Sequence, residues 1–490
     1  MKNQNFDKAK KQFEEGVKFF QLEDFGSAET AFLNSLESFP NRLSTISNLI
    51  KLYIKTNDKK KLSDILEKYK EFKNHNEFLF GQAYKFFFEK NIKESMNICK
   101  EILKDENLKS SVQDLIALNY KNEKNFLKAL KVYKKKIQNN RNNFMVYYNI
   151  GCLFFDLGKI NQAYYFFKKS NKLNPDDNPT WWNMALCALT LKDLKKGFDL
   201  YEYRWKKANP DKKKFEHINS PKSPEQITDK KILIWDEQGL GDAINFSRFV
   251  IDLLKYTSKI TLVVDEKLRE ILSNLHPKII VVDYRSLNEK EFDFQLSICS
   301  LPKFLKVSST DDIHYYKLTL KNHFQKPNYI SKKKLNVGLA WSGNPKYAVD
   351  EYRSISFNYF KEILNPNKIN FFRLSQDSQD RKTSDLSLFS NSNDYGKKTL
   401  FEVANLMKYL DFVISSDTSI IHLAGILEVK SILLLNYNSD WRWFDDKEKT
   451  VWYPSVKIIK QKKFDTWGSV FDELKEEIQR MTNLSKKKGQ

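Results

Sequence analysis

The sequence lacks the features that mark disulfide-stapled, zinc-binding, secreted or membrane-spanning proteins. Its 490 residues include four cysteines, Cys99, Cys152, Cys187 and Cys299, which form neither a CxxC pair nor a dense framework. We therefore expect buried thiols in a reducing compartment and no structural zinc. No stretch approaches the roughly 18 uninterrupted apolar residues of a membrane span, and the opening MKNQNFDKAKKQFEEG lacks the apolar core of a secretory signal. These absences predict a cytoplasmic protein.

Acidic residues are in the minority, because 83 Lys and Arg against 62 Asp and Glu give a formal net charge of +21. Such an excess favours nucleic-acid binding where basic residues cluster, since clustered cations release counterions from phosphate backbones. Here the lysines are dispersed along the whole chain. We expect no specific nucleic-acid partner, and only a general attraction to acidic partners, nucleotides or anionic membrane surfaces.

A repeat organises the first two hundred residues. Gly16 and Gly151 lie 135 residues apart, close to four periods of the tetratricopeptide repeat at about 34 residues each. Small residues let the two helices of a hairpin approach, aromatic residues fill the space between hairpins, and proline ends the second helix. The sequence predicts an α-helical solenoid of about six repeats over residues 1–208, with degenerate repeats near 43–108. The residues at matching offsets are Gly16, Phe19, Ala28, Phe32 and Pro40 in one repeat and Gly151, Phe154, Ala163, Phe167 and Pro175 in another.

The pattern changes after a predicted linker at residues 209–230, which is rich in proline and charge. Short β-branched runs then alternate with amphipathic stretches, which predicts parallel sheets with crossover helices. We expect an N-terminal Rossmann-like domain at 231–330, a C-terminal one at 335–480 and a disordered tail at 481–490. Ligands of such sheets bind outside the carboxyl ends of the strands. The predicted strands are KILIW, ITLVVD, KIIVVD and FDFQLSI, then NVGLAW, INFFRLS, DFVISS and SILLLNY.

The first loop of chemical interest is QGLGD, Gln238 to Asp242, between a predicted strand and helix. We expect Gly239 and Gly241 to allow positive φ and close approach by a ligand, and the helix start to attract an anion. The loop is neither a Walker loop, since no Gly-Lys-Ser/Thr follows, nor the full dinucleotide fingerprint, since the third glycine is absent. Asp242 has two open interpretations, a helix cap or a general base.

A second loop follows the strand NVGLA. Ser342, Gly343 and Asn344 are small and polar enough to wrap a phosphate, and Lys346 or Arg353 could neutralise a leaving diphosphate. An ordinary turn with solvated charges is the alternative.

A third loop follows DFVI, where Asp417, Thr418 and Ser419 open a helix and His422 comes within about one turn. Together they could bind one diphosphate. A capping cluster with a satisfied core histidine is the alternative. For the aromatic segment 441–453, packing over the end of the sheet is favoured over stacking on a sugar or base.

Taken in order, these segments resemble a known family. EQGLGD, FSR, GLAWSGNP, SSDTSIIHLAG, DWRWF and WYPS, behind tetratricopeptide repeats, are similar to repeat-fused glycosyltransferases of the heptosyltransferase-like family nine, from about residue 200 to 480. The resemblance implies a GT-B fold, two Rossmann-like domains facing a cleft, with Asp242 as the base. The substrate-binding residues that we predict are Glu237, Gln238, Gly239, Gly241, Ser342, Gly343, Asn344, Arg353, Asp417, Thr418, Ser419 and His422.

The expected activity is inverting transfer of a sugar from a nucleotide-diphosphate sugar to an acceptor hydroxyl. The sequence has no Asp-x-Asp metal motif, so we expect no metal and no cofactor, with helix N-termini and side chains stabilising the leaving diphosphate. After FDF, where the family would have a different polar group on the acceptor side, this sequence has Gln295. The sequence therefore does not identify the acceptor. The repeats suggest a polypeptide partner. The alternative is a repeat scaffold with a vestigial, non-catalytic transferase half.

Overall fold

The computed structural model describes residues 2–206, 214–321, 325–345, 350–363, 367–375, 389, 393–444, 446, 448–464 and 466–488. The chain divides into two compact units, Met1–Leu153 and Phe154–Gln490. This division differs from the predicted boundary near residue 208. The physical reason is that the last hairpin shares a core with the sheets: Leu189 and Phe198 pack in one cluster with Ile234 and Phe246.

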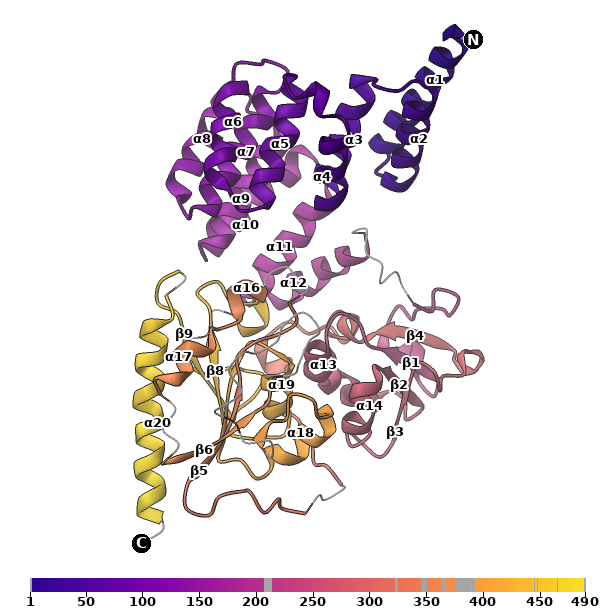
Figure 1. The fold of residues 1–490 in the computed structure, drawn as a ribbon. Helices are drawn as coiled ribbons and strands as arrows, with labels where there is room; N and C mark the ends of the chain where they lie inside the picture. The colour runs from indigo at the N-terminus through magenta and orange to yellow at the C-terminus, as the bar shows by residue number, and fades with distance from the viewer. Residues whose placement is uncertain are drawn as a thin grey trace. The chain divides into compact units, whose positions relative to one another are not determined.

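The first unit consists of helices that pack in sequential order (Figure 1). Because each helix from α1 to α8 contacts its neighbours in this series, its apolar face is covered locally, as repeat stacking requires. Its helices are α1 (Lys2–Gln21), α2 (Phe25–Ser38), α3 (Leu43–Lys55), α4 (Lys59–Lys68), α5 (Asn76–Phe88), α6 (Ile92–Ile102), α7 (Lys109–Asn122), α8 (Phe126–Asn139) and the first part of α9 (Phe144–Asp156). The second unit continues with α10 (Ile160–Leu173), α11 (Asn178–Thr190) and α12 (Leu194–Tyr201).

One turn recurs between the two helices of each hairpin. A residue with positive φ precedes the helix start, and the next residue is the N-cap, whose side chain in most repeats accepts a backbone hydrogen bond. The period holds through residues 43–108, where the sequence suggested degenerate repeats. The positive-φ residues are Glu23, Asn57, Lys90, Lys124, Gly158 and Lys192; the residues after them are Asp24, Asp58, Asn91, Asn125, Lys159 and Asp193.

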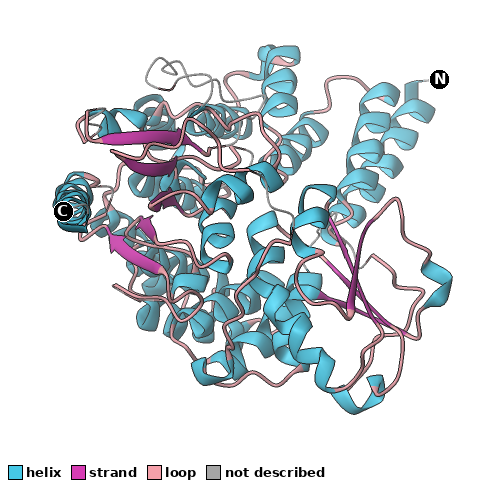
Figure 2. Cartoon of the chain, turned by 90° about the horizontal axis from the view of Figure 1, so that it is seen from below, coloured by secondary structure: helices cyan, strands magenta, loops and turns pink. Residues whose placement is uncertain are grey.

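Two parallel sheets complete the second unit, with strands drawn in magenta in Figure 2. Their strand orders are β3-β2-β1-β4 and β6-β5-β7-β8-β9. All eight predicted runs form strands, whereas β9 was not predicted, because its lysine-flanked sequence VKIIK has no alternation. The strands are β1 (Ile232–Trp235), β2 (Ile260–Val264), β3 (Ile279–Asp283), β4 (Phe294–Ser297), β5 (Leu335–Ala340), β6 (Ile369–Arg373), β7 (Phe412–Ser416), β8 (Ser431–Leu435) and β9 (Val456–Lys460).

Helices cover the faces of these sheets. Helix α13 packs against α19 and α14 against α18, so the two α/β halves meet through helices. The helices are α13 (Leu240–Asp252), α14 (Glu266–Leu272), α15 (Leu301–Phe304), α16 (Asp350–Arg353), α17 (Phe357–Lys361), α18 (Leu400–Met407), α19 (Ser419–Ile426) and α20 (Gly468–Lys488).

Two predicted irregular segments have structure. Helix α20 includes residues 481–488, where we expected a disordered tail, and its earlier part packs on α17 and β9 through Phe471 and Leu474 (Figure 1). Residues 214–230 of the predicted linker lie on the first sheet, with Phe215 and Ile218 buried beside Trp235. Residues 209–213 lie outside the described part of the chain.

Within the described residues, no helix has both the length and the apolar character that a membrane span needs. The four cysteines are thiols and not disulfide halves, and Cys99, Cys187 and Cys299 are buried.

Candidate functional site

The three predicted loops all begin at the carboxyl ends of strands where the strand order reverses. In the first sheet the chain moves from β1 to β2 and β3 on one side and then returns to place β4 on the other side of β1. In the second sheet it places β6 on one side of β5 and then β7 on the other. The loops after β1, β5 and β7 are the three that the sequence singled out. Reversal of strand order opens a crevice at the carboxyl edge of a parallel sheet, where ligands bind. The topology therefore places all three loops where chemistry is expected.

The glycine loop after β1 differs in conformation from the prediction. The positive φ, 64°, belongs to Gln238, whereas Gly239 has φ −107° and is the N-cap of α13. Gly241 allows a close approach by α19 of the other half. A Cβ at Gly241 would lie 2.9 Å from Cδ2 of His422 and 3.5 Å from Cα of Ser419, both on α19. The glycine loop and α19 thus come from opposite halves and touch.

Asp242 lies in the first turn of α13 and uses both carboxylate oxygens. Its Oδ2 accepts a hydrogen bond of 2.9 Å from the Gly239 backbone N–H, and its Oδ1 forms an ion pair with Nη2 of Arg442. The capping interpretation is therefore present in the structure, together with an ion pair to the other half. Burial raises the pKa of Asp242, while the Arg442 guanidinium opposes the shift.

Arg442 joins the two halves, although sequence reasoning missed this role by treating the segment as packing. Its Nη1 donates to Oδ1 of Asp440 at 2.9 Å. Its Nη2 donates to the hydroxyl of Tyr201 and to Oε1 of Gln238, both at 3.3 Å. The side chain lies over the Trp441 ring, 4.6 Å from its centroid. The sequence DWRWF, in which an arginine lies between two tryptophans, could have indicated a guanidinium fixed by cation–π contacts.

Glu237, which we predicted to bind substrate, is buried and is held by neighbouring side chains. Its Oε1 accepts hydrogen bonds from Nε and Nη2 of Arg204 at 2.9 and 2.7 Å and from Ser297 at 2.5 Å. Arg204 belongs to the turn Glu202–Lys206 that follows α12. A buried carboxylate needs such a partner to remain charged. The end of the repeat array therefore supports the glycine loop through Arg204 and Tyr201, a contact that the sequence did not reveal.

Gln295, expected near the acceptor, is buried on β4. Its Oε1 accepts a hydrogen bond of 2.6 Å from the Trp235 indole, and its Nε2 donates to Ser220 at 2.9 Å. Both polar ends of this side chain are used within the first half, so it anchors the segment that precedes β1.

The described residues of the second loop interact with residues that follow shortly after them in the chain. Ser342 and Gly343 are half-buried and Asn344 is exposed. The Gly343 N–H donates to Ser354 at 3.2 Å, and Arg353 pairs with Asp350 at 3.0 Å. A Cβ at Gly343 would lie 2.5 Å from Nη2 of Arg353, so a larger residue there would displace the guanidinium. Lys346 lies outside the described residues.

The third loop opens α19. Thr418 is the N-cap, with its hydroxyl accepting from the Ile420 N–H at 3.3 Å, and Ser419 is half-buried. Burial raises the pKa of Asp417 to about 6, and the Asp440 carboxylate adds to the shift while Arg353 opposes it. The charge on Arg353 of the second loop therefore acts on Asp417 of the third.

His422 follows within the same helix and is buried. Its ring stacks on Trp443 at 5.1 Å and 20°, and its Nδ1 lies 3.0 Å from the hydroxyl of Tyr453. Burial, together with Arg442, Arg248 and Arg353, lowers the pKa of His422 to about 3. The histidine is therefore neutral at physiological pH.

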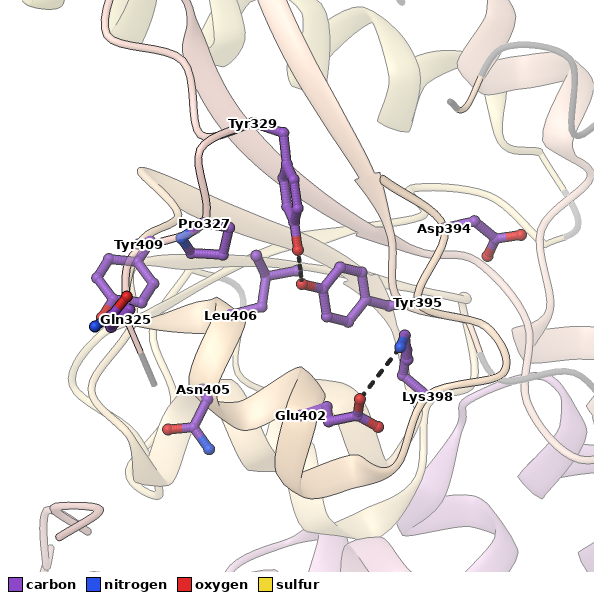
Figure 3. A pocket seen from close by; sticks show the side chains of 10 residues that line it. All are labelled: Gln325, Pro327, Tyr329, Asp394, Tyr395, Lys398, Glu402, Asn405, Leu406 and Tyr409. Atoms are coloured by element: carbon purple, nitrogen blue, oxygen red, sulfur yellow. Dashed lines mark hydrogen bonds and ion pairs between the residues drawn. The ribbon is translucent and has the colours of Figure 1, made fainter. Parts of the chain in front are cut away.

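A cavity of about 350 Å³ lies beside α18, apart from these loops (Figure 3). The hydroxyls of Tyr329 and Tyr395 are 2.5 Å apart at its wall, and Lys398 pairs with Glu402 at 3.3 Å. None of the residues predicted to bind substrate lines it.

Among the described residues, no three His, Cys, Asp or Glu side chains gather as metal ligands would. Two buried donors near the glycine loop, Nε of Arg442 and Nδ2 of Asn245, have no hydrogen-bond partner within that part of the chain. Buried polar groups without partners cost free energy, so both are suited to meet a ligand or an ordered water.

The fold defines a class of protein with an array of helical hairpins followed by two parallel α/β sheets. No protein-family model matches the chain. Protein FlbA of Caulobacter vibrioides is 21% identical over 411 residues, which cover 69% of this chain and 67% of FlbA.

Solved structures that resemble parts of the chain are of two kinds. PilF of Pseudomonas aeruginosa is 14% identical with a TM-score of 0.30, over 40% of this chain and 90% of PilF. TibC, an iron-containing dodecameric glycosyltransferase from enterotoxigenic E. coli, is 13% identical with a TM-score of 0.33, over 42% of this chain and 58% of TibC.

Proposed function

We propose that the chain is an inverting glycosyltransferase that moves a sugar from a nucleotide-diphosphate sugar to an acceptor hydroxyl. The observation that carries this proposal is the meeting of Asp242 with Arg442 and of Gly241 with His422. A carboxylate on α13 of the first half thereby pairs with Arg442 of the second half, beside the contact between Gly241 and α19. Such an arrangement suits a reaction that needs a base on one side and stabilisation of a leaving anion on the other.

In the proposed reaction, the acceptor oxygen attacks the anomeric carbon as the bond from that carbon to the diphosphate oxygen breaks. Asp242 receives the hydroxyl proton, and the nucleoside diphosphate leaves with the bonding electron pair. Arg442 orients the carboxylate and opposes the rise in its pKa that burial causes. The start of α19 and the guanidinium of Arg353 supply positive charge to the diphosphate, without a metal ion.

In this proposal the helical hairpins bind the acceptor and bring it to the α/β half. Stacked hairpins create an extended surface that suits a polypeptide, so a protein acceptor is the hypothesis that we favour. The resemblance of the motif order to that of glycosyltransferase family nine supports the same activity.

The test combines binding with a matched pair of variants. Nucleotide-sugars carrying ADP, GDP, UDP or CMP are screened by thermal shift, where a ligand at 100 times its dissociation constant adds about 2.7 kcal/mol. The Asp242→Asn variant should lose about 10²- to 10⁴-fold in transfer, the usual contribution of a positioned base. Asp265→Asn is the control, because Asp265 caps α14 at the end of β2 in the same sheet.

Equal transfer by wild type and Asp242→Asn would remove Asp242 from the role of base. Absence of any thermal shift across the four nucleotide classes would favour the alternative, a repeat scaffold whose α/β half is not catalytic.

A further inference from the structure

A chain of hydrogen bonds ends on His422 and determines which ring nitrogen carries the proton. It starts at Arg248, which is 2% exposed and donates from Nε to the Asn245 carbonyl at 2.9 Å and from Nη2 to the Asn245 side-chain oxygen at 3.3 Å. A guanidinium only donates. The amide of Asn245 must therefore present its oxygen, and not its NH2 group, to Arg248.

The next link is Tyr453. Its hydroxyl lies 3.0 Å from the same oxygen, Oδ1 of Asn245, which can only accept, so Tyr453 donates its one proton there. The Tyr453 hydroxyl is also 3.0 Å from Nδ1 of His422. Since its proton is already used, the hydroxyl accepts in this second contact. His422 consequently carries its proton on Nδ1.

The other ring nitrogen is then a free acceptor. In a neutral imidazole with Nδ1 protonated, Nε2 holds a lone pair. Burial and three arginines keep the ring neutral. Nε2 faces the glycine loop, 3.5 Å from the position that a Cβ of Gly241 would occupy, and no described residue forms a hydrogen bond with it. A lone pair repels phosphate oxygens, so a diphosphate contact at this atom is disfavoured.

We infer that Nε2 of His422 accepts a hydrogen bond from a substrate hydroxyl beside Gly241, instead of donating one to the donor diphosphate. This inference rests on the proposed function, because that function supplies the hydroxyl. The hydroxyl is a group of the donor sugar or of the acceptor. It assigns His422 to recognition of a hydroxyl and leaves diphosphate binding to Arg353 and the start of α19.

The protonation state can be measured without any substrate. The full chain is labelled with 15N at its histidine side chains, and the His422 signals are identified from their loss in a His422→Gln variant. We expect one protonated nitrogen, Nδ1, and a non-protonated Nε2 at pH 7. A proton on Nε2, or on both nitrogens, would overturn the inference. In a Tyr453→Phe variant, which removes the acceptor of the Nδ1 proton, the preference for this tautomer should weaken.

Binding separates the two roles. Inorganic pyrophosphate is titrated into wild type, His422→Gln and His422→Phe, and its affinity should agree within about twofold. Transfer should fall about three- to tenfold in His422→Phe, the effect of one lost neutral hydrogen bond, and recover partly in His422→Gln, which keeps an acceptor. A tenfold loss of pyrophosphate affinity in both variants contradicts the inference. Failure of every nucleotide-sugar to bind would sink the proposed function, whereas the tautomer measurement would still decide the state of His422.

Discussion

The two compact units differ in what they bury. In the first unit, Lys136 is the one buried charged side chain among the described residues, and its partner Asp114 is 32% exposed. The second unit buries Arg204, Glu237, Arg248, Arg442 and other charged residues in the described part of its chain. Burying charge is costly unless it is paired and hydrogen-bonded. Stacked hairpins achieve their fold without that cost, so the second unit holds its charges for another purpose, which we propose is chemistry.

The largest expected effect compares one change in each unit. Arg204→Met leaves Glu237 buried without its cation, and removing one partner of a buried pair costs about 3–5 kcal/mol. Lys136→Met leaves Asp114 partly exposed and able to hydrate, so its loss should be about 1 kcal/mol or less. Urea unfolding is followed by tryptophan fluorescence for the second unit, which contains all nine tryptophans, and by circular dichroism for both.

The double variant Arg204→Met with Glu237→Met is the control, since it removes both charges and should recover much of the lost stability. If Arg204→Met and Lys136→Met lowered the free energy of unfolding equally, buried charge would contribute to stability in the same way in both units.

A second comparison uses two glycines with equally close neighbours. A Cβ at Gly241 would lie 2.9 Å from His422, and a Cβ at Gly81 in the first unit would lie 2.9 Å from Ile50. Each change to Ala should cost about 1–3 kcal/mol through overpacking. Gly241→Ala should also weaken nucleotide-sugar affinity, measured by calorimetry, whereas Gly81→Ala should not. If both variants bound the nucleotide-sugar with equal affinity, the glycine loop would not be part of the ligand site.

The smallest effect concerns pH. The pKa of Asp417 is raised to about 6 from an ordinary value of 3.8, so the folded state binds more protons than the unfolded state between these values. Stability should therefore fall as pH rises through this range, and ionised Asp417 is a cost at pH 7.5. Asp417→Asn should raise the thermal midpoint at pH 7.5 by a few degrees, and the gain should vanish near pH 3.5. A gain that is the same at both pH values would contradict this origin.

Much of the fold could be predicted from the sequence because its signals are local. Gly16 and Gly151 marked the period of the hairpins, and the apolar runs marked eight strands. The unit boundary could not be found in this way, since it depends on Leu189 and Phe198 joining a core whose other members lie far along the chain.

The candidate site was predictable in its loops but not in its contacts. The glycines and polar residues of QGLGD and SSDTS stand out because strand-to-helix turns have their own composition. Arg442 lies 200 residues from Asp242 and Tyr453 lies 208 residues from Asn245, so only the folded chain brings each pair together. Glu237 shows the same limit, because its position inside the protein depends on Arg204 from another element.

The most direct test of the central claim is a crystal structure of the full chain with the nucleoside diphosphate of whichever nucleotide-sugar binds. The account predicts diphosphate density at the start of α19, beside Arg353 and across from Asp242. Density in the cavity lined by Tyr329 and Tyr395, with the loops at Asp242 and His422 empty, would contradict it.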